Sequence, residues 1–401
     1  MDGIVIIGAG ECGTRAAFAL REAGYPGPVT LVGAEPHLPY ERPPLSKPTN
    51  GAVQMKLICA KEALEAAGID YLQSMSASKL DTRAGTVTLS DGRMLKYEKL
   101  LLATGARPRR LACPGAELAL DFRTHADAEV IFASVAPGRS VAVIGGGLIG
   151  MELAAVLRGK DVAVSVIEAA PKPLGRAVPQ RFAEKLHARH ASEGVRFHLD
   201  RGVVAIGDGG VTLTHGSMVP ADLVVSAIGV QPDVALAEAA GLATGNGILT
   251  DTCLRTSAPN VFAAGDCAAV AQPAGGHFRY ESWRNARAQA ETAARNMAGA
   301  TEAFAAIPWF WSDQYDLGLQ VAGLPRPAHQ SVVRSVAAGE LEFYLDDGRL
   351  VAAAGLGIGN GLARDIKLAE MLIAAGTTPD PAALADPGLN LKTLLKSARA
   401  A

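Results

Sequence analysis

At 401 residues and 41.3 kDa, the chain has room for two or three domains, which excludes a peptide, a minimal binding module or a disulfide-stapled miniprotein. Hydrophobic residues make up 49% and charged residues 19% of the chain, a composition typical of compact globular proteins and not of disordered ones. Lys and Arg number 38 against 40 Asp and Glu, so the net charge of −2 excludes a global basic field that would collect nucleic acid or anionic lipid.

The cysteine pattern favours a reducing compartment. The chain has five cysteines, an odd number, with no C-x-x-C spacing, which is typical of neither a disulfide framework nor a zinc ribbon. The chain enters an apolar strand pattern at Ile4, unlike the cationic start of a signal peptide. The longest apolar stretch, 141–157, contains Glu152 and three successive glycines, and so predicts a buried strand entering a helix. We expect a cytoplasmic protein that binds neither membrane nor nucleic acid.

Two segments of the chain resemble each other, and each reads as an apolar strand, a G-x-G-x-x-G loop, a helical pattern, a second strand and an acid. The first starts at residue 3 and ends at Glu35, and the second starts at residue 141 and ends at Glu168. The glycines of the loops are Gly8, Gly10 and Gly13 in the first segment and Gly145, Gly147 and Gly150 in the second.

The loop glycines have separate physical tasks. One allows a tight turn from strand to helix, one lets the backbone approach a pyrophosphate, and one lets the helix pack closely on the strand. The start of the helix then presents unpaired N–H groups and a partial positive charge to the phosphates. A single loop of this kind also occurs in plain packing, but two copies in full context predict two bound dinucleotides.

The acids at the ends of the second strands indicate which dinucleotides bind. A carboxylate accepts hydrogen bonds from a ribose diol and repels a 2′-phosphate, so Glu168 favours NADH over NADPH at the second site. Arg176 lies near enough in sequence to soften that preference.

Beyond the repeats, apolar strands are expected in the runs 100–105 and 223–229, which end in small residues, and in the run 261–266, which ends in Asp266. A carboxylate at the carboxyl end of a parallel strand points into the ligand crevice. After Pro308 the composition changes: alternating runs at 341–345 and 350–353 flank the turn 346–348, and an amphipathic helix is expected over 363–374. The fold class expected is α/β, with two Rossmann-like dinucleotide-binding domains and a C-terminal α+β domain.

These residues resemble a known family, the FAD-dependent NADH:ferredoxin reductases that serve cytochromes P450 and Rieske-type oxygenases, within the two-dinucleotide flavoproteins. The resemblance covers essentially the whole chain. It is carried by residues 8–13, 39–47, 103–105, 145–152, 261–266, 281–283 and 308–314.

The resemblance implies that the first loop binds FAD. It places Glu35 on the adenosine ribose, Arg42 and Arg123 near the phosphates, Asp266 on the ribityl or pyrophosphate region and Trp283 beside the flavin. The implied FAD-binding residues are Gly8, Gly10, Gly13, Glu35, Arg42, Lys47, Ala77, Ala103, Thr104, Gly105, Arg123, Asp266 and Trp283.

The resemblance also implies that the second loop binds NADH, with Glu152 near the nicotinamide carboxamide. The implied NAD-binding residues are Gly145, Gly147, Leu148, Ile149, Gly150, Glu152, Glu168, Arg176 and Gly229. In the family the NAD domain interrupts the FAD domain. The expected domains are therefore 1–109 with 231–305 for FAD, 110–230 for NAD and 306–401 at the C-terminus.

Lys47 and Glu152 are the expected catalytic residues. The family places the lysine near flavin N5, where a cation stabilises the charge gained on reduction and can pair with the carboxylate of Glu152. The alternative for Lys47 is a solvated lysine in a proline-rich loop. Cys12 is expected to pack, since neither the cysteine pair of the disulfide reductases nor the single loop cysteine of the peroxidases is present. Glu11 stands where the family commonly has histidine, an awkward charge beside a pyrophosphate unless it points to solvent.

Other candidates remain open at this point. His187 and His190 have a spacing that could share a metal, but exposed helix histidines are expected and no metal site is predicted. Trp309 and Trp311 either belong to the C-terminal core or line the outer face of the flavin. Basic residues near the flavin edge are expected to steer an acidic partner: Arg279, Arg284, Arg287 and Arg295.

The implied reaction takes a hydride from NADH and passes electrons singly to a [2Fe–2S] ferredoxin or a rubredoxin, a transient acidic partner. The chain is expected to be a monomer or a weak homodimer. Two alternatives remain: a flavoprotein reductase of another acceptor, or a redox-sensing interaction protein of the apoptosis-inducing-factor type. The second is disfavoured because the C-terminal domain lacks a long insertion or a basic run.

Overall fold

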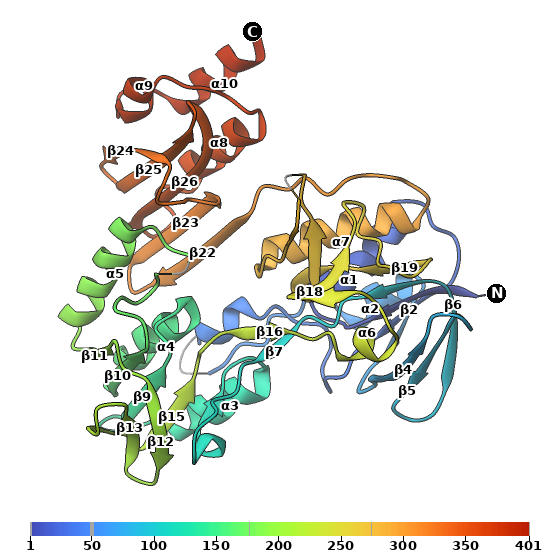
Figure 1. The fold of residues 1–401 in the computed structure, drawn as a ribbon, viewed down its shortest axis with the longest axis horizontal. Coiled ribbons are helices and arrows are strands. Elements are labelled where there is room, and N and C mark those ends of the chain that lie inside the picture. Colours follow the sequence, from blue (N-terminus) through green and yellow to red (C-terminus); the bar gives the residue numbers. More distant parts are fainter. Residues whose placement is uncertain (1, 49–51, 176, 274, 401) are drawn as a thin grey trace. The chain divides into compact units, whose positions relative to one another are not determined.

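The computed structural model describes residues 2–48, 52–175, 177–273 and 275–400 (Figure 1). These residues form two compact units, and each is built from segments that are distant in sequence. The first unit comprises Met1–Leu45, Gln54–Arg107 and Val230–Ala306, and the second comprises Ser46–Val53, Pro108–Gly229 and Ile307–Ala401.

The first unit is built around a seven-stranded sheet in the order β3-β2-β1-β6-β5-β4, with β19 paired to β6. The strands β19, β6, β1, β2 and β3 run parallel, whereas β4, β5 and β6 form an antiparallel extension. The strand bounds are β1 (Gly3–Ile7), β2 (Val29–Val32), β3 (Ile69–Leu72), β4 (Ala77–Asp81), β5 (Thr86–Leu89), β6 (Met94–Leu102) and β19 (Val261–Ala263).

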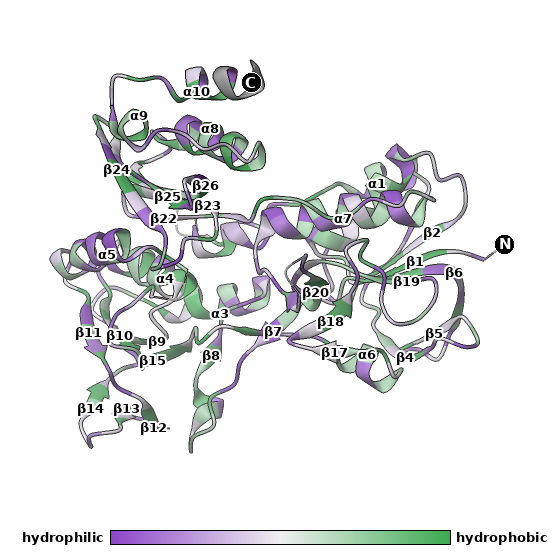
Figure 2. Ribbon diagram, turned by 45° about the horizontal axis from the view of Figure 1, so that its top comes forward, coloured by the Kyte–Doolittle hydropathy of each residue, from purple (hydrophilic) through white to green (hydrophobic). Residues whose placement is uncertain are grey.

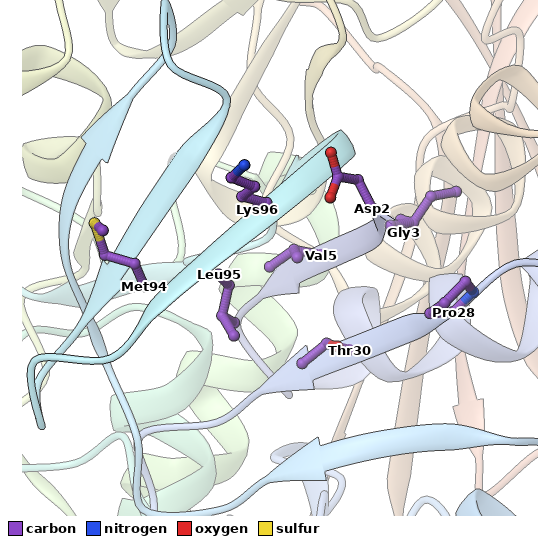
Figure 3. A pocket seen from close by; sticks show the side chains of 9 residues that line it. Asp2, Gly3, Val5, Pro28, Thr30, Met94, Leu95 and Lys96 are labelled. Carbon is purple, nitrogen blue, oxygen red and sulfur yellow. The ribbon is translucent and has the colours of Figure 1, made fainter.

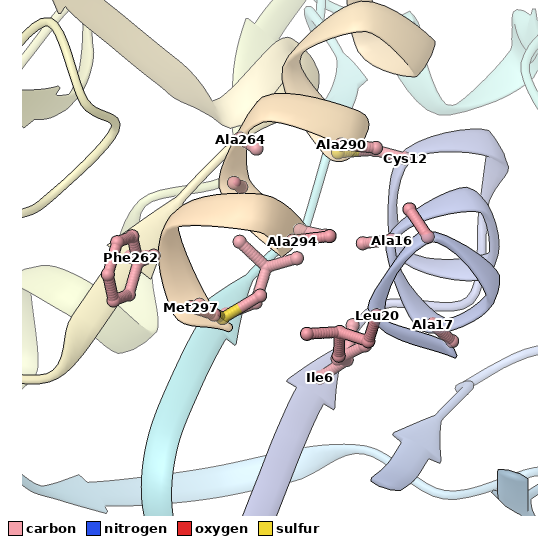
Figure 4. Packing of buried hydrophobic residues seen from close by; sticks show 14 of the residues in the cluster. Ile6, Cys12, Ala16, Ala17, Leu20, Phe262, Ala264, Ala290, Ala294 and Met297 are labelled. Atoms are coloured by element: carbon pink, nitrogen blue, oxygen red, sulfur yellow. The ribbon is translucent and has the colours of Figure 1, made fainter. Parts of the chain in front are cut away.

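Alternation along the parallel strands divides the core of this unit into two layers. On one face, Ile4 and Ile6 pack against α1 (Glu11–Glu22) and α7 (Trp283–Met297), where small side chains such as Ala16 and Ala290 let the two helices approach (Figure 4). On the other face, Val5 and its neighbours pack under the β4–β5 extension. The parallel strands are therefore buried on both faces, as expected for a dinucleotide-binding sheet.

The rest of the first unit consists of short elements. They are α2 (Lys61–Ala66), α6 (Ala235–Ala239), the 3-10 helices η1 (Pro43–Ser46) and η3 (Gly265–Cys267), the pair β7 (Ala106–Pro108) and β16 (Val230–Pro232), and a sheet of β17 (Thr244–Gly245), β18 (Gly247–Thr250), β20 (Ala268–Ala271) and β21 (His277–Phe278).

The second unit contains a five-stranded parallel sheet in the order β11-β10-β9-β15-β8 and a small antiparallel sheet of β12, β13 and β14. Figure 2 shows hydrophobic residues along β9 and β15 and a largely hydrophilic α5. The bounds are η2 (Ala116–Leu118), β8 (Leu120–Asp121), α3 (His125–Ser134), β9 (Ser140–Ile144), α4 (Leu148–Arg158), β10 (Ala163–Glu168), α5 (Gln180–Ser192), β11 (Arg196–Leu199), β12 (Val203–Gly207), β13 (Gly210–Leu213), β14 (Met218–Pro220) and β15 (Leu223–Ser226).

The same unit also contains a C-terminal antiparallel sheet in the order β22-β23-β26-β25-β24. The predicted hairpin is formed by β25 and β26, whose turn carries Asp347 and Gly348 at φ 46° and 78°. The helix predicted over 363–374 is α8, which packs on this sheet with Phe343 and Ile366 in its core. The bounds are β22 (Trp309–Gln314), β23 (Leu317–Gly323), β24 (Gln330–Val336), β25 (Gly339–Asp346), β26 (Arg349–Ile358), α8 (Ala363–Ala374), α9 (Pro381–Ala385) and α10 (Leu391–Ala400).

The predicted fold class is confirmed: two parallel Rossmann-like sheets are followed by an α+β C-terminal region. The exact predicted domain boundaries, at 109/110, 230/231 and 305/306, stay a prediction. None of the helices within the described ranges is long and apolar enough to cross a membrane.

Candidate functional site

The first glycine loop lies at the carboxyl end of β1 and has the geometry that the sequence predicts. Gly8 has a φ of +108°, and a Cβ there would lie 2.1 Å from the carbonyl oxygen of Ala103. A Cβ on Gly13 would lie 1.8 Å from the carbonyl oxygen of Gly8, so only glycine lets α1 start this close to β1. A Cβ on Gly10 would meet no atom within 4 Å. The loop therefore closes tightly at Gly8 and Gly13 and is open at Gly10.

The start of α1 leaves its first N–H groups available. Gly10 is the N-cap residue, and no side chain accepts a hydrogen bond there. The first backbone bond of the helix runs from the N–H of Thr14 to the carbonyl of Gly10, at 3.0 Å. The N–H groups that precede it, together with the open space at Gly10, fit the pyrophosphate of a dinucleotide such as FAD.

The second loop repeats this geometry at the carboxyl end of β9. Gly145 has a φ of +106°, and a Cβ there would lie 2.4 Å from the carbonyl oxygen of Ala227. A Cβ on Gly150 would lie 2.1 Å from the carbonyl oxygen of Gly145, whereas Gly147 is open and is the uncapped N-cap of α4. Leu148 and Ile149 form the first turn of that helix. The two loops are thus equivalent cradles, as their sequences predict.

The two acids hold different partners. Glu35 follows β2 and accepts hydrogen bonds of 2.5 Å from the hydroxyl of Tyr40 and from Nη2 of Arg42. Glu168 ends β10 and accepts the N–H groups of Gly146 at 2.7 Å and of Ala170 at 2.8 Å. Each carboxylate has further lone pairs for a ribose diol. Glu35 and Arg42, which the sequence assigns to one cofactor, are therefore brought together.

Several other predicted residues gather at the carboxyl end of the first sheet. The N–H of Ala103 bonds the carbonyl of Ile7 at 2.8 Å, and the hydroxyl of Thr104 bonds the carbonyl of Asp233 at 2.6 Å. Gly105 has a φ of +72°. Asp266 lies in η3, directly after β19. Since β1, β6 and β19 are parallel neighbours, these segments share the edge at which the first cradle opens.

Glu11 and Cys12 occupy the first turn of α1. Burial raises the pKa of Glu11 and the charge of Glu41 adds to the effect, while Arg287, Arg15 and a hydrogen bond with Trp283 oppose it. Glu11 therefore does not simply point to solvent but lies among groups that include the predicted flavin neighbour Trp283.

Cys12 packs in the core beside α7 (Figure 4), and burial raises the pKa of its thiol well above the ordinary value. This environment agrees with the expected packing role, because a reactive cysteine needs a lowered pKa.

Some predicted residues lie elsewhere in the chain. Ala77 begins β4 in the first unit, and Arg123 lies just before the capped start of α3 in the second unit. The carbonyl of Gly229 accepts the N–H of Arg109 at 3.0 Å. Arg176 lies outside the described residues.

Lys47 and Glu152 do not form the expected direct ion pair, because each side chain has other partners. The ammonium of Lys47 instead bonds the carboxylate of Asp313, and it lies 5.5 Å from the ring centroid of Trp311. Glu152 accepts two hydrogen bonds of 2.6 Å, from the hydroxyls of Ser46 and Ser312. Burial raises the pKa of Glu152, and the charge of Lys47 opposes that shift, so Lys47 still acts on Glu152 through space.

Two further expectations are wrong. His190 is not an exposed helix histidine: it is 0% exposed and bonds the side chains of Gln314 and Tyr315. Arg279 does not belong to an exposed basic patch, because its side chain is only 5% exposed and bonds Glu281 and Asn246. Both residues have hydrogen-bond partners that are distant in sequence, and the linear pattern does not reveal them.

Sequence reasoning missed the polar groups around Glu152. The linear pattern gives no separate role to four residues that lie within the longer motifs 39–47 and 308–314: Ser46, Ser312, Asp313 and Gln314. A detectable signal existed on β22, where Ser312 and Gln314 alternate with Trp311 and Asp313 and therefore face one side of the strand. Two buried polar residues on one strand face indicate a hydrogen-bonded network. Trp309 and Trp311 stack on the same strand with ring centroids 5.5 Å apart.

A surface pocket at the other end of the first sheet does not belong to the candidate site. It is lined by Gly3, Pro28 and Thr30 and by Met94 and Lys96 (Figure 3). It lies at the amino ends of β1 and β2, opposite the ends at which parallel sheets bind ligands. Within the described ranges, no group of three or more His, Cys, Asp or Glu side chains could hold a metal ion.

Comparison with known proteins identifies the family. Residues 2–290 match the pyridine nucleotide-disulphide oxidoreductase family, and residues 309–395 match the reductase C-terminal family. The ferredoxin–NAD(+) reductase component of the anthranilate 1,2-dioxygenase system of Burkholderia cepacia is 42% identical, over 98% of this chain and 99% of that protein. Rhodocoxin reductase of Rhodococcus erythropolis is 38% identical, over 97% of this chain and 93% of that protein.

Solved structures agree. The ferredoxin reductase of the CYP199A2 system of Rhodopseudomonas palustris has a TM-score of 0.93 at 34% identity, covering 98% of this chain and 100% of that one. Putidaredoxin reductase, in its covalent complex with putidaredoxin, has a TM-score of 0.92 at 32% identity, covering 100% of this chain and 99% of that one. The chain therefore belongs to the pyridine nucleotide-disulphide oxidoreductases and, among them, to the ferredoxin reductases with a reductase C-terminal domain.

Proposed function

We propose that the chain is an NADH-dependent ferredoxin reductase that binds FAD in the first cradle and NADH in the second. The observation that carries this function is the pair of equivalent cradles, each with two glycines that admit no Cβ and one that is open. One cradle would serve a simple dehydrogenase, whereas two imply a bound electron carrier and a nicotinamide donor. The proposed domains are 1–109 with 231–305 for FAD, 110–230 for NAD and 306–401 at the C-terminus.

The first cradle fits FAD because of its donors and its acid. The uncapped N–H groups of α1 would bind the pyrophosphate, and Glu35 would accept from the adenosine ribose while Arg42 holds that carboxylate in place. Thr104 and Asp266 lie at the same sheet edge, where Asp266 would bind the ribityl or pyrophosphate region. Bound FAD supplies the acceptance of a hydride from NADH and the release of electrons one at a time.

The second cradle is assigned to NADH. Glu168 is fixed by two backbone N–H groups at 2.7 and 2.8 Å, so its carboxylate is held where a ribose diol would bind and a 2′-phosphate would meet like charge. Glu152 would accept from the nicotinamide carboxamide. Lys47, which pairs with Asp313 and lies over the ring of Trp311, would stabilise negative charge gained during reduction.

The acceptor is proposed to be a [2Fe–2S] ferredoxin that serves an oxygenase. The relatives are named as ferredoxin–NAD(+) reductase components of dioxygenase systems, and one structural neighbour is solved with putidaredoxin bound. A rubredoxin is the second acceptor to test. Of the arginines expected to steer an acidic partner, Arg287 and Arg295 remain substantially exposed.

The experiment is anaerobic reduction of the purified flavoprotein. We expect FAD to bind, NADH to bleach its visible absorbance much faster than NADPH, and a [2Fe–2S] ferredoxin to be reduced catalytically. Cytochrome c, which responds only when the ferredoxin is added, serves as the coupled readout. A protein that cannot be reconstituted with FAD, or one that NADH reduces without onward transfer to either redoxin, would contradict the proposal.

A further inference from the structure

A continuous chain of side-chain hydrogen bonds runs through the second unit and ends on Glu152. The hydroxyl of Tyr315 lies 3.2 Å from Nδ1 of His190, and Nε2 of His190 lies 2.8 Å from Oε1 of Gln314. Nε2 of Gln314 donates to the hydroxyl of Ser312 at 3.0 Å, and that hydroxyl donates to Oε1 of Glu152 at 2.6 Å. This hydrogen-bond chain connects α4 and α5 with β22, which follows them by more than a hundred residues.

The donors in this chain all point towards Glu152. Oε1 of Gln314 is only an acceptor, so Nε2 of His190 must carry the hydrogen of that bond. Nδ1 of the neutral imidazole is then an acceptor, and the hydroxyl of Tyr315 donates to it. The aligned dipoles therefore present their positive ends to the carboxylate, and hydrogen bonds aligned in this way strengthen one another.

The interior of the hydrogen-bond chain is buried. His190 and Gln314 are 0% exposed and Ser312 is 1% exposed. Buried polar groups are costly unless each is satisfied, so three such groups in one row are strongly ordered when all their bonds are formed. The other oxygen of Glu152 accepts the hydroxyl of Ser46 at 2.6 Å. The carboxylate is consequently held by one short hydrogen bond on each oxygen.

The surroundings of the hydrogen-bond chain shift the pKa values of its two titratable members, Glu152 and His190. Burial raises the pKa of Glu152, Lys47 and the two serine hydroxyls lower it, and Asp313 raises it. Burial lowers the pKa of His190 to about 4, helped by His187 and Arg189, while its bond with Gln314 opposes the shift. The imidazole is therefore neutral near pH 7 and keeps the donor direction described above.

We propose that His190 is a positioning residue for Glu152, acting through Gln314 and Ser312 to hold the carboxyl group of Glu152 in one orientation. This row of hydrogen bonds does not conduct protons, because the side-chain amide of Gln314 does not pass on a proton in the way that a hydroxyl or an imidazole does. The inference rests on the proposed function in one respect only: the oriented carboxylate of Glu152 would be a fixed acceptor for the carboxamide of NADH.

The test is an infrared pH titration of the FAD-loaded protein, in which the C=O band of a protonated carboxyl reports Glu152. Glu152→Gln removes the band and so assigns it. Ser312→Ala deletes the last donor and is expected to raise the proton affinity of Glu152 about tenfold, and His190→Leu about threefold, since each link passes on part of its polarisation. His190→Gln keeps an N–H donor towards Gln314 and restores the wild-type titration.

The matched control is His187→Leu, on the same helix one turn away, where the imidazole packs 4.3 Å from the ring of Phe197 and outside the chain. It leaves the titration of Glu152 unchanged. If His190→Leu does not fold, His190→Met removes the donor while its flexible side chain fills the same space. An unchanged titration in folded His190→Leu, or in the folded replacement variant without the donor, overturns the proposal, even if that variant is less stable. Failure to reduce a ferredoxin would contradict the proposed function but leave this titration unaffected.

Discussion

We expect Gly147→Ala to weaken nucleotide binding at the second cradle while leaving the stability of the fold almost unchanged. The backbone of Gly147 has φ −77° and ψ −177°, which alanine adopts without strain, and a Cβ there meets no protein atom within 4 Å. We therefore expect the free energy of unfolding to change by no more than about 0.5 kcal/mol, because the lost flexibility of the unfolded chain offsets a weaker N-cap.

The same methyl group would stand between the start of α4 and a bound pyrophosphate. Displacing the phosphate from two N–H donors at about 1.5 kcal/mol each weakens NADH binding by about 3 kcal/mol, roughly a hundredfold in Kd. The measurement is a titration of the flavoprotein with NADH under anaerobic conditions, followed by thermal unfolding of the same preparation. Flavin content is expected to remain at the wild-type level.

Gly150→Ala is the matched control because its effects are reversed in order. A Cβ at that position would lie 2.1 Å from the carbonyl oxygen of Gly145, against an ordinary contact of 3.4–4 Å, so the helix must move before any nucleotide binds. Such overpacking costs about 1–3 kcal/mol and lowers the Tm by several degrees. Wild-type NADH affinity in Gly147→Ala, within about threefold, would refute the assignment of this loop to the pyrophosphate.

Three other outcomes follow from the structure. Glu168→Ala should reduce the preference for NADH over NADPH by at least about tenfold, measured as the ratio of the two Kd values. The reason is that the repulsion of the 2′-phosphate and two ribose hydrogen bonds are lost. An unchanged ratio would place the ribose elsewhere. Burial lowers the pKa of His190 to about 4. The free energy of unfolding is therefore retained above pH 6.5 and falls by about 3 kcal/mol as the pH drops from 6.5 to 4. In urea unfolding, this free energy should depend less steeply on pH in His190→Gln than in the wild type, and an identical dependence would contradict the burial argument. Phe343→Ala, at a 0% exposed position, should destabilise the C-terminal core by about 3–5 kcal/mol while the flavin spectrum is retained, and a loss of flavin would show that this core also supports the first cradle.

The fold was predictable to the extent that it depends on local pattern. The second strand predicted in the first repeated segment is β2, and the helix predicted over 363–374 is α8, because apolar periodicity and turn residues decide both. The helix predicted after the first glycine loop is α1, which begins at Glu11, inside the loop, since the loop supplies its first turn. The sequence also predicts two cradles, because close backbone approaches leave glycine as the only fitting residue.

The surroundings of Glu152 were less predictable because they arise from long-range contacts. The positions of Ser312 and Gln314 are set by the pairing of β22 with β23, and that of His190 by the face of α5 that becomes buried. Helical spacing alone gives His190 the same status as His187, yet only His190 lies at 0% exposure. Which histidine becomes buried is decided by packing partners more than a hundred residues away, as the contact with Gln314 illustrates.

The route of the chain through the first sheet has a consequence for its biosynthesis. The central strand β6 pairs with β1 on one side and with β19, some 160 residues later, on the other. A nascent chain therefore holds an open strand edge until β19 has been synthesised, and such edges recruit other chains. The intervening segment carries a parallel sheet of its own, and pairing of β7 with β16 brings its two ends together. Early folding of that insert would shorten the loop that β19 has to close, so its stability governs how long a ribosome-bound intermediate stays prone to aggregation.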